Sequence, residues 1–157
     1  MAPTGPLPLV GIPCDIREIA PHPFHAVGEK YINGVAHGAR AIPLLIPGFG
    51  GGRDMAPLDE LIDIDDLLDG LDGIFLPGSP SNVEPRLYGG HAPRPTTLLD
   101  VQRDVLSMPL IRRNAFAVVN HLHPQPIWRC ANADLGLCRL GIIDNPKVNN
   151  FTFIIFF

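Results

Sequence analysis

One stretch, residues 73–85, most constrains how this chain can fold. It begins Gly-Ile-Phe-Leu and continues Pro-Gly-Ser-Pro-Ser-Asn-Val-Glu-Pro. A short apolar run that ends in turn-forming residues is typical of a buried strand in a parallel sheet, followed by a loop at the carboxyl edge of that sheet. In open α/β sheets this edge is where ligands bind. The stretch therefore predicts both a type of sheet and the place of a binding site.

The loop half of this stretch offers backbone and side-chain donors. Gly78 lets a main-chain N–H approach a ligand closely, because it has no side chain in the way. Ser79, Ser81 and Asn82 add side-chain donors beside it. The same residues also suit an ordinary polar turn, since Gly and Pro favour tight turns. The loop residues alone leave both interpretations open.

The rest of the chain up to residue 117 predicts an alternation of strands and helices. Strands are predicted at residues 7–13 and 41–46, helices at 26–37, 58–71 and 96–117, and loops at 16–25, 47–53 and 83–95. Pro43 removes one ladder donor, so the strand that contains it is expected near a sheet edge or bulged. The order β-α-β-α-β-loop-α is the start of a doubly wound parallel sheet, an α/β fold.

Composition and charge exclude several classes of protein. The chain has 157 residues, with 46% hydrophobic and 18% charged residues, which fits one globular domain. A formal net charge of −4 provides no basic footprint, so neither nucleic acid nor a membrane surface is expected as a partner. The first residues lack the basic-then-apolar pattern of a signal peptide. We therefore expect a cytoplasmic protein.

The cysteines predict no disulfide framework and no metal site. Cys14, Cys130 and Cys138 are odd in number and widely spread, which suits a reducing compartment. Cys130 and Cys138 lack zinc-ligand spacing with a histidine pair, so no metal and no cofactor are expected. Cys14 follows the first predicted strand without a visible base partner, and is predicted to be a small buried residue. The glycines of residues 47–53 lack a phosphate-binding pattern and predict a plain loop.

Several segments, in order along the chain, resemble one enzyme family. They are Val-Gly-Ile-Pro-Cys-Asp (10–15), His-Pro-Phe-His-Ala-Val-Gly-Glu-Lys-Tyr (22–31), Ile-Pro-Leu-Leu-Ile-Pro (42–47), the stretch at 71–85, and Tyr-Gly-Gly (88–90). Together they resemble the N-terminal half of γ-glutamyl-γ-aminobutyrate hydrolases, which are class I glutamine-amidotransferase-like hydrolases. The resemblance divides the chain into residues 1–117 and a non-homologous tail at residues 118–157.

This resemblance implies a fold, a reaction and a set of site residues. The fold is a three-layer αβα sandwich with a mostly parallel sheet, incomplete in this chain. The reaction is a Cys-His-Glu thiol hydrolysis of a small γ-glutamyl amide, which passes through a thioester. Gly78 then supplies a backbone N–H to the oxyanion, and Ser79 and Asn82 line the substrate pocket. Glu29 and Tyr31 lie in the helix that matches the family.

After Ala117 the sequence departs from the family pattern. The family continues with an apolar strand and Gly-Ile-Cys-Arg-Gly, whereas this chain has Pro-Ile-Trp-Arg-Cys-Ala at residues 126–131. Cys130 is the remaining candidate for the nucleophile, although Arg129 interrupts the apolar run and no Arg-Gly follows. His123 begins His-Pro-Gln where the family has His-Pro-Glu, and it precedes the cysteine. We interpret His121 and His123 as loop histidines.

These departures predict a hydrolase by family that is truncated and inactive as this chain. Eight of the nine residues 149–157 are Phe, Ile or Asn, which predicts a frame change or a junction after Ala117. The alternative for residues 151–157 is a terminal strand. The alternative function is a non-catalytic α/β module that binds a small molecule, or that pairs as a homodimer or through an open sheet edge.

Overall fold

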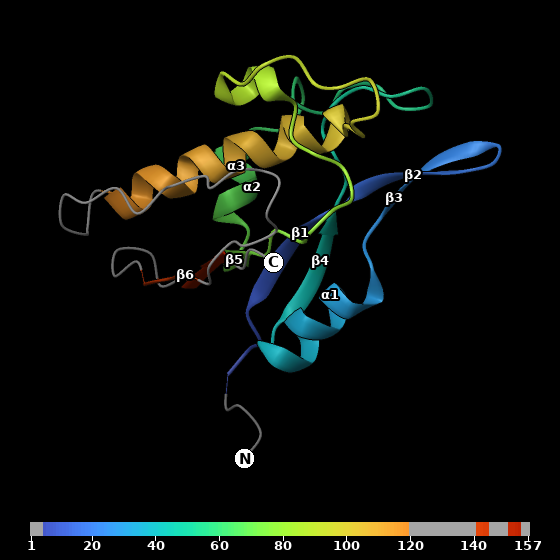
Figure 1. Cartoon of the computed structure of the whole chain (residues 1–157). Helices are drawn as coiled ribbons and strands as arrows, with labels where there is room; N and C mark the ends of the chain where they lie inside the picture. Colours follow the sequence, from blue (N-terminus) through green and yellow to red (C-terminus); the bar gives the residue numbers. More distant parts are fainter. Residues whose placement is uncertain (1–4, 120–140, 145–150, 155–157) are drawn as a thin grey trace.

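The computed structural model of the chain describes residues 5–119, 141–144 and 151–154. Its centre is a parallel sheet with the strand order β4–β1–β5 (Figure 1). The strands are β1 (Leu9–Pro13), β4 (Ile42–Ile46) and β5 (Gly73–Ile74). Leu9 is in register with Ile42, and Val10 with Gly73. The parallel sheet predicted from residues 73–85 is confirmed, although β5 is two residues shorter than the apolar run.

Helices cover both faces of this sheet, which gives the expected α/β sandwich of three layers in an incomplete form (Figure 1). On one face lie α1 (Glu29–Asn33) and the π-helical turn η1 (Gly34–Gly38) that continues it. On the other face lie α2 (Ile64–Asp69) and α3 (Val101–Val119). Side chains alternate along β1, so Val10 and Ile12 face α1 and η1, where they pack with Val35 and Phe75.

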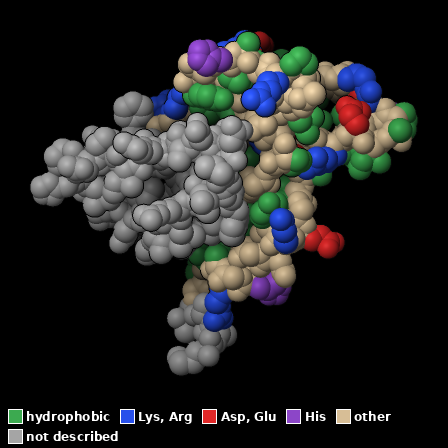
Figure 2. Space-filling model, in the orientation of Figure 1, with side chains coloured by type: hydrophobic (Ala, Val, Ile, Leu, Met, Phe, Trp, Pro, Cys, Tyr) green, Lys and Arg blue, Asp and Glu red, His purple; other side chains and the backbone are tan. Residues whose placement is uncertain are grey.

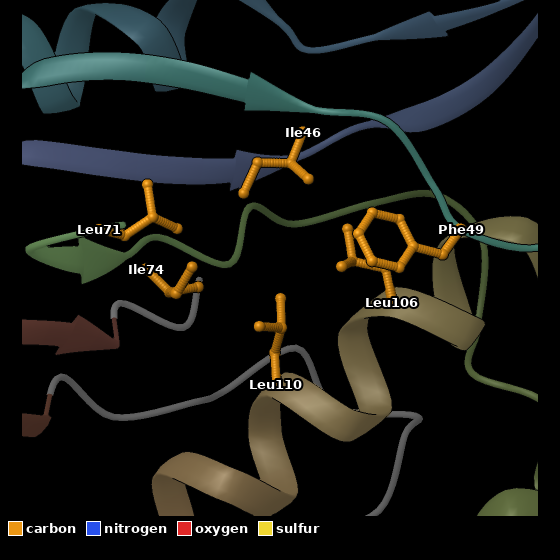
Figure 3. Close-up of a cluster of buried hydrophobic side chains, with 6 residues drawn as sticks. All are labelled: Ile46, Phe49, Leu71, Ile74, Leu106 and Leu110. Atoms are coloured by element: carbon orange, nitrogen blue, oxygen red, sulfur yellow. The ribbon is translucent and has the colours of Figure 1, made fainter. Parts of the chain in front are cut away.

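The core between the sheet and α3 fixes the position of that helix. It is a cluster of six apolar side chains, each at most 5% exposed: Ile46, Phe49, Leu71, Ile74, Leu106 and Leu110 (Figure 3). Burying side chains of this size stabilises a fold by roughly 1.5–3 kcal/mol each. The cluster joins the ends of β4 and β5 to α3. The first turns of α3 therefore lie near the carboxyl edge of the sheet.

The prediction of a loop at residues 16–25 is wrong. These residues form an antiparallel hairpin of β2 (Asp15–Ile19) and β3 (His22–Ala26), with a cis peptide bond between Ala20 and Pro21. The prolines exclude a helix but not a ribbon, because both strands of a two-stranded ribbon are edge strands that tolerate proline. The hairpin projects away from the sheet (Figure 1).

Three helix boundaries differ from the sequence prediction. The helix predicted at residues 26–37 begins at Glu29. The helix predicted at 58–71 is shortened to α2, because the Asp63 carboxylate accepts the Asp65 N–H at 2.8 Å and so caps the helix there. The helix predicted from residue 96 begins at Val101, and it retains Pro109. The predicted loop at residues 83–95 contains a 3₁₀ helix, η2 (Pro85–Tyr88).

The expectation that Pro43 marks an edge strand is confirmed, because β4 is the outer strand of the sheet. The Ile42 N–H donates to the Pro8 carbonyl at 2.7 Å, and the Ile46 carbonyl accepts the Cys14 N–H at 2.9 Å. Backbone groups alternate in direction along a strand, so residues 42, 44 and 46 face β1 and residues 43 and 45 face away from it. Pro43 therefore lacks its N–H on the free side of β4.

The last described segments are the strands β6 (Gly141–Asp144) and β7 (Phe151–Ile154), which pair antiparallel. The alternative of a terminal strand is thus present over part of residues 151–157. α3 continues through Ala117 to Val119, where the change of sequence character was predicted. Among the residues that the structure describes, no helix is long and apolar enough to span a membrane.

Candidate active-site loop

The candidate site is the loop between β5 and η2, residues 75–84, which we call the serine loop. It leaves the sheet at its carboxyl edge, as residues 73–85 predict. Its first residue is held to the central strand, because the Phe75 N–H donates to the Gly11 carbonyl at 2.8 Å. Gly78 is half-buried. The expected oxyanion donor therefore lies in a loop whose first residue is fixed by the sheet.

Two hydroxyl groups form the polar part of this loop. The Ser79 Oγ accepts the Ser81 N–H at 3.1 Å and lies 2.8 Å from the Ser81 Oγ. Either hydroxyl can donate in this pair, which uses one of the two hydroxyl hydrogens. The other hydrogen can be donated to a ligand. The structure thus brings Ser79 and Ser81 together beside Gly78, and one O–H donor of the pair is not used between them.

Asn82 ties the far half of the serine loop to the segment before α3. Its backbone N–H donates to the Leu98 carbonyl at 2.8 Å, and it forms a parallel bridge with Leu99. The Asn82 side chain is exposed. The position of Asn82 is therefore set by its backbone hydrogen bond, which the sequence did not predict. Its side-chain amide remains accessible to a ligand.

Glu84 ends the serine loop and carries a polar atom that the sequence prediction did not single out. Its Oε1 is paired with the Arg86 Nε at 2.6 Å. Its Oε2 is buried, and no described residue hydrogen-bonds to it. The Glu84 N–H donates to the Asp104 Oδ2 at 2.9 Å. The only sequence signal for this arrangement was that Glu84 is a polar residue in a predicted loop.

A cluster of buried charges beside the loop was also missed. Arg103 lies between Asp15 and Asp104, with nitrogen–oxygen distances of 3.2 and 3.3 Å. Asp100 caps α3, since its Oδ1 accepts the Arg103 N–H at 2.9 Å. Asp104 and Arg103 are adjacent in the chain, but the partner from β2 is 88 residues away from Arg103. Such a contact depends on the tertiary fold and leaves no local pattern.

The loop after β4, residues 47–54, is the second loop at this edge, and we call it the glycine loop. Its backbone packs against α3, where the Gly50 N–H donates to the Gln102 carbonyl at 3.1 Å. The Gly48 N–H donates to the His25 Nδ1 at 3.0 Å, so the proton of the neutral imidazole is on Nε2. The glycine loop is a packed connection, and it is a loop, as residues 47–53 predict.

Cys14 is a buried residue of the sheet edge and not a reactive thiol. Its side chain is 2% exposed. Burial, with a smaller contribution from the charge of Asp15, raises the pKa of the Cys14 thiol to about 11. The thiolate is the nucleophilic form of cysteine, so this thiol is unreactive near neutral pH. The prediction of a small buried residue is confirmed.

The remaining predicted site residues divide into two groups. Cys130, His121 and His123 lie outside the described residues. Glu29 and Tyr31 both lie in α1, as the resemblance implies. Glu29 is exposed, whereas the Tyr31 ring packs against the Phe75 ring, with centroids 5.9 Å apart. Tyr31 therefore supports the first residue of the serine loop from the opposite layer.

Among the described residues no metal-binding group lies at this loop, and its basic neighbours are paired with carboxylates, Arg86 with Glu84 and Arg103 with Asp104. Within residues 5–119, 141–144 and 151–154, no group of three His, Cys, Asp or Glu side chains could hold a metal ion. On the face shown in Figure 2, Lys and Arg side chains are scattered among hydrophobic and uncharged groups. The serine loop itself can provide hydrogen-bond donation from the Gly78 backbone amide and from the Ser79 and Ser81 hydroxyl groups.

Comparison with known proteins identifies the family of this chain. Residues 8–120 match the family model of Peptidase C26. The chain belongs to this family. It is 38% identical to "Gamma-glutamyl-gamma-aminobutyrate hydrolase PuuD" of Escherichia coli (strain K12) and 36% identical to the gamma-glutamyl-gamma-aminobutyrate hydrolase of Shigella flexneri, each over 104 residues. These matches cover 66% of this chain.

The resemblance to γ-glutamyl-γ-aminobutyrate hydrolases, and with it the class I glutamine-amidotransferase-like fold, is therefore confirmed for this part of the chain. The same 104 residues cover 37% of the length of each of these relatives. The residues that match the Peptidase C26 model, 8–120, contain the serine loop and do not contain Cys130.

Proposed function

We propose that this chain provides the substrate-binding half of a hydrolase of γ-glutamyl amides, of the γ-glutamyl-γ-aminobutyrate type. One observation carries the proposal: Gly78, Ser79 and Asn82 lie in a single loop at the carboxyl edge of the sheet, in a chain 38% identical to a γ-glutamyl-γ-aminobutyrate hydrolase. Donors at this edge are well placed to bind an amide carbonyl.

In the proposed mechanism, Gly78 stabilises the charge that develops on the amide oxygen. In the reaction of a complete hydrolase of this type, a thiolate attacks the γ-carbonyl carbon, and the C=O π electrons move to the oxygen, which accepts the Gly78 N–H. The C–N bond then breaks, the amine leaves with a proton from a general acid, and a thioester remains. Water cleaves the thioester to glutamate and regenerates the thiol. Ser79 and Asn82 orient the γ-glutamyl group.

We also propose that residues 1–117 carry this binding function, while residues 118–157 form a separate tail. Cys14 is excluded as the nucleophile by its burial and raised pKa. Cys130 departs from the family pattern on both sides, as the sequence shows. The chain is accordingly proposed to bind a γ-glutamyl amide without turning it over, and to do so in the cytoplasm.

Incubation of the purified chain with γ-glutamyl-γ-aminobutyrate tests both parts of the proposal. Binding is measured by isothermal titration calorimetry, and release of γ-aminobutyrate by chromatography. We expect binding that Asn82→Ala weakens, with no release of product. Asn33→Ala is the matched control, since Asn33 is an exposed asparagine at the end of α1. The absence of binding would refute the substrate class, and release abolished by Cys130→Ala would refute inactivity.

Exposed apolar residues on β4 favour a second candidate, a module that pairs with another chain. Ile42, Leu44 and Leu45 are 42–48% exposed at the edge of the sheet. Strand addition there is hindered, because Pro43 lacks an N–H on the free side and Pro47 lacks one just beyond the strand. Sedimentation of the purified chain decides this point: a dimer dispersed by Leu44→Lys would support pairing, and a monomer would exclude a homodimer.

A further inference from the structure

A buried cluster of charges connects the serine loop to the first turns of α3. Asp15, Asp100 and Asp104 surround Arg103, and the four side chains come from the start of β2 and the start of α3. Asp104 is 1% exposed and Arg103 is 8% exposed. The Arg103 guanidinium reaches Asp15 Oδ1 through one nitrogen at 3.2 Å and Asp104 Oδ1 through another at 3.3 Å.

Two carboxylates of this cluster use their other oxygens to hold backbone amides, while Asp15 Oδ2 pairs with the Arg17 Nη2 at 3.2 Å. Asp104 Oδ2 accepts the Glu84 N–H at 2.9 Å. Asp100 Oδ2 accepts the Ile16 N–H at 2.8 Å. Arg17, these N–H donors and the N-terminus of α3 balance the carboxylate charge that Arg103 alone does not neutralise. The cluster therefore links three segments: the start of the hairpin, the first turns of α3 and the end of the serine loop.

We propose that Arg103 is a positioning residue for the serine loop, acting through Asp104. The near end of the loop is held by β1, through the Phe75 N–H and the Gly11 carbonyl at 2.8 Å. The far end is held by Asp104 through the Glu84 N–H, beside the hydrogen bond from the Asn82 N–H to the Leu98 carbonyl. Gly78 lies between these two anchors. The proposal rests on the proposed function of Gly78, and it adds the residue that keeps its amide in one place before substrate arrives.

The geometry requires an arginine in this position. A guanidinium presents several N–H donors in a rigid planar fork, so it can bind two carboxylates on different segments at once. The ammonium group of a lysine is a single point and does not reproduce that fork. Arg103→Lys therefore keeps the positive charge and removes the bridge between Asp15 and Asp104. This separates charge neutralisation from positioning.

Hydrogen exchange of individual amides, measured by NMR on the full chain, tests the proposal. The Asn82 and Glu84 amides report on the serine loop, and the Cys14 and Ile42 amides report on the sheet. In Arg103→Lys we expect the loop amides to exchange at least tenfold faster, while the sheet amides change by less than threefold. Arg113→Ala is the matched control, because Arg113 is an arginine of the same helix whose surface partner is Asp65 at 2.9 Å.

Equal acceleration of loop and sheet amides would overturn the proposal, since it would show an ordinary stabilising ion pair. Unchanged loop exchange would overturn it as well. If Arg103→Lys does not fold, Asp104→Asn serves in its place, because the amide oxygen can still accept the Glu84 N–H while the charge that holds Arg103 is gone. We expect the same selective loosening there, and the same two results would refute it.

Binding of γ-glutamyl-γ-aminobutyrate to the same variants separates this proposal from the proposed function. In Arg103→Lys we expect at least fivefold weaker binding, since a loop that is open for part of the time binds with reduced apparent affinity. Unchanged binding with a loosened loop would refute the positioning role. No binding by the unmodified chain would refute the proposed function instead, and the exchange data would still decide whether Arg103 fixes the loop.

Discussion

The glycine loop and the serine loop leave neighbouring positions at the same edge of the sheet, yet they are built in opposite ways. The glycine loop is pressed against α3. A methyl group added at Gly48 would lie 2.7 Å from the carbonyl carbon and oxygen of Gln102, and one added at Gly50 would lie 2.8 Å from the Gln102 Cα. Gly48 and Gly50 are needed because two backbones approach closely there.

The serine loop is instead held at its ends and polar in its middle. Its anchors are the Phe75, Asn82 and Glu84 amides, while the Ser79 and Ser81 hydroxyls bind each other and use one of their two hydrogens. The comparison teaches that glycine content alone does not mark a binding loop. The loop with more glycines is structural, and the loop with hydroxyl groups around one glycine is the candidate site.

The largest effect is expected from Gly48→Ala in the glycine loop. The added methyl group meets backbone atoms of α3, which cannot move without shifting the helix. Overpacking of this kind costs about 1–3 kcal/mol, and we expect the upper end of that range in the free energy of unfolding. Urea denaturation followed by circular dichroism measures the change.

Gly52→Ala is the matched control for this substitution. Its added methyl group would lie 2.5 Å from the Gln102 Nε2, which is the end of a flexible side chain. Because that side chain can rotate away, we expect a smaller loss than in Gly48→Ala. Equal losses in the two variants would show that the glycine loop is not packed as the structure indicates.

The next effect concerns Cys14, which lies at the end of β1 between the two loops. Its thiol pKa of about 11 in the folded chain exceeds the ordinary value of 9.0. The unfolded chain therefore loses this proton first, so the contribution to stability is complete below about pH 9 and is lost as the pH rises to about 11. A shift of this size corresponds to about 2–3 kcal/mol.

Comparison with Cys14→Ala isolates this contribution from other groups that titrate at high pH. We expect the free energy of unfolding of the unmodified chain to fall more steeply between pH 9 and pH 11 than that of the variant. Parallel curves for the two proteins would contradict the burial of the thiol. The measurement is urea denaturation at a series of pH values.

The sequence predicted the layers of this fold because its strands are apolar and its turns are explicit. Pro43 predicted an edge strand or a bulge, and the structure shows the edge strand. The hairpin was missed because Pro21 and Pro23 exclude a helix without excluding a ribbon, and the apolar alternation of residues 15–19 is weak. The start of α3 was misplaced because the capping role of Asp100 depends on a side chain whose other oxygen binds Ile16.

For the candidate site, the sequence predicted the position of the loop but not what holds it. Gly78, Ser79 and Asn82 follow a recognisable strand, so their place at the sheet edge could be inferred from local pattern. Arg103 and Asp15 are 88 residues apart, and only the folded chain brings them together. The place of the candidate binding residues was therefore predictable, and the contacts that hold their loop were not.

A smaller effect is expected from Gln102→Ala, which tests the side-chain part of the glycine-loop contact. The Gln102 Nε2 donates to the Gly50 carbonyl at 3.0 Å, whereas the backbone contact of Gln102 remains in the variant. The loss of one neutral hydrogen bond costs about 1 kcal/mol. We expect urea denaturation to show that loss, with γ-glutamyl-γ-aminobutyrate binding unchanged. Weakened binding would show that the two loops are coupled.

The smallest effect on stability, and a clear effect on binding, is expected from Ser79→Ala in the serine loop. The variant loses the Oγ that accepts the Ser81 N–H at 3.1 Å in a partly buried loop, so the free energy of unfolding should fall by about 0.5–1 kcal/mol. It also removes one hydroxyl from the pair that can donate to a ligand. We therefore expect calorimetry to show roughly tenfold weaker binding of γ-glutamyl-γ-aminobutyrate, the equivalent of about 1.4 kcal/mol. Gln102→Ala is the contrasting variant, since it should lose more stability and no affinity. If Gln102→Ala instead weakened binding and Ser79→Ala did not, the glycine loop would be the binding loop. The roles assigned to the two loops would then have to be exchanged.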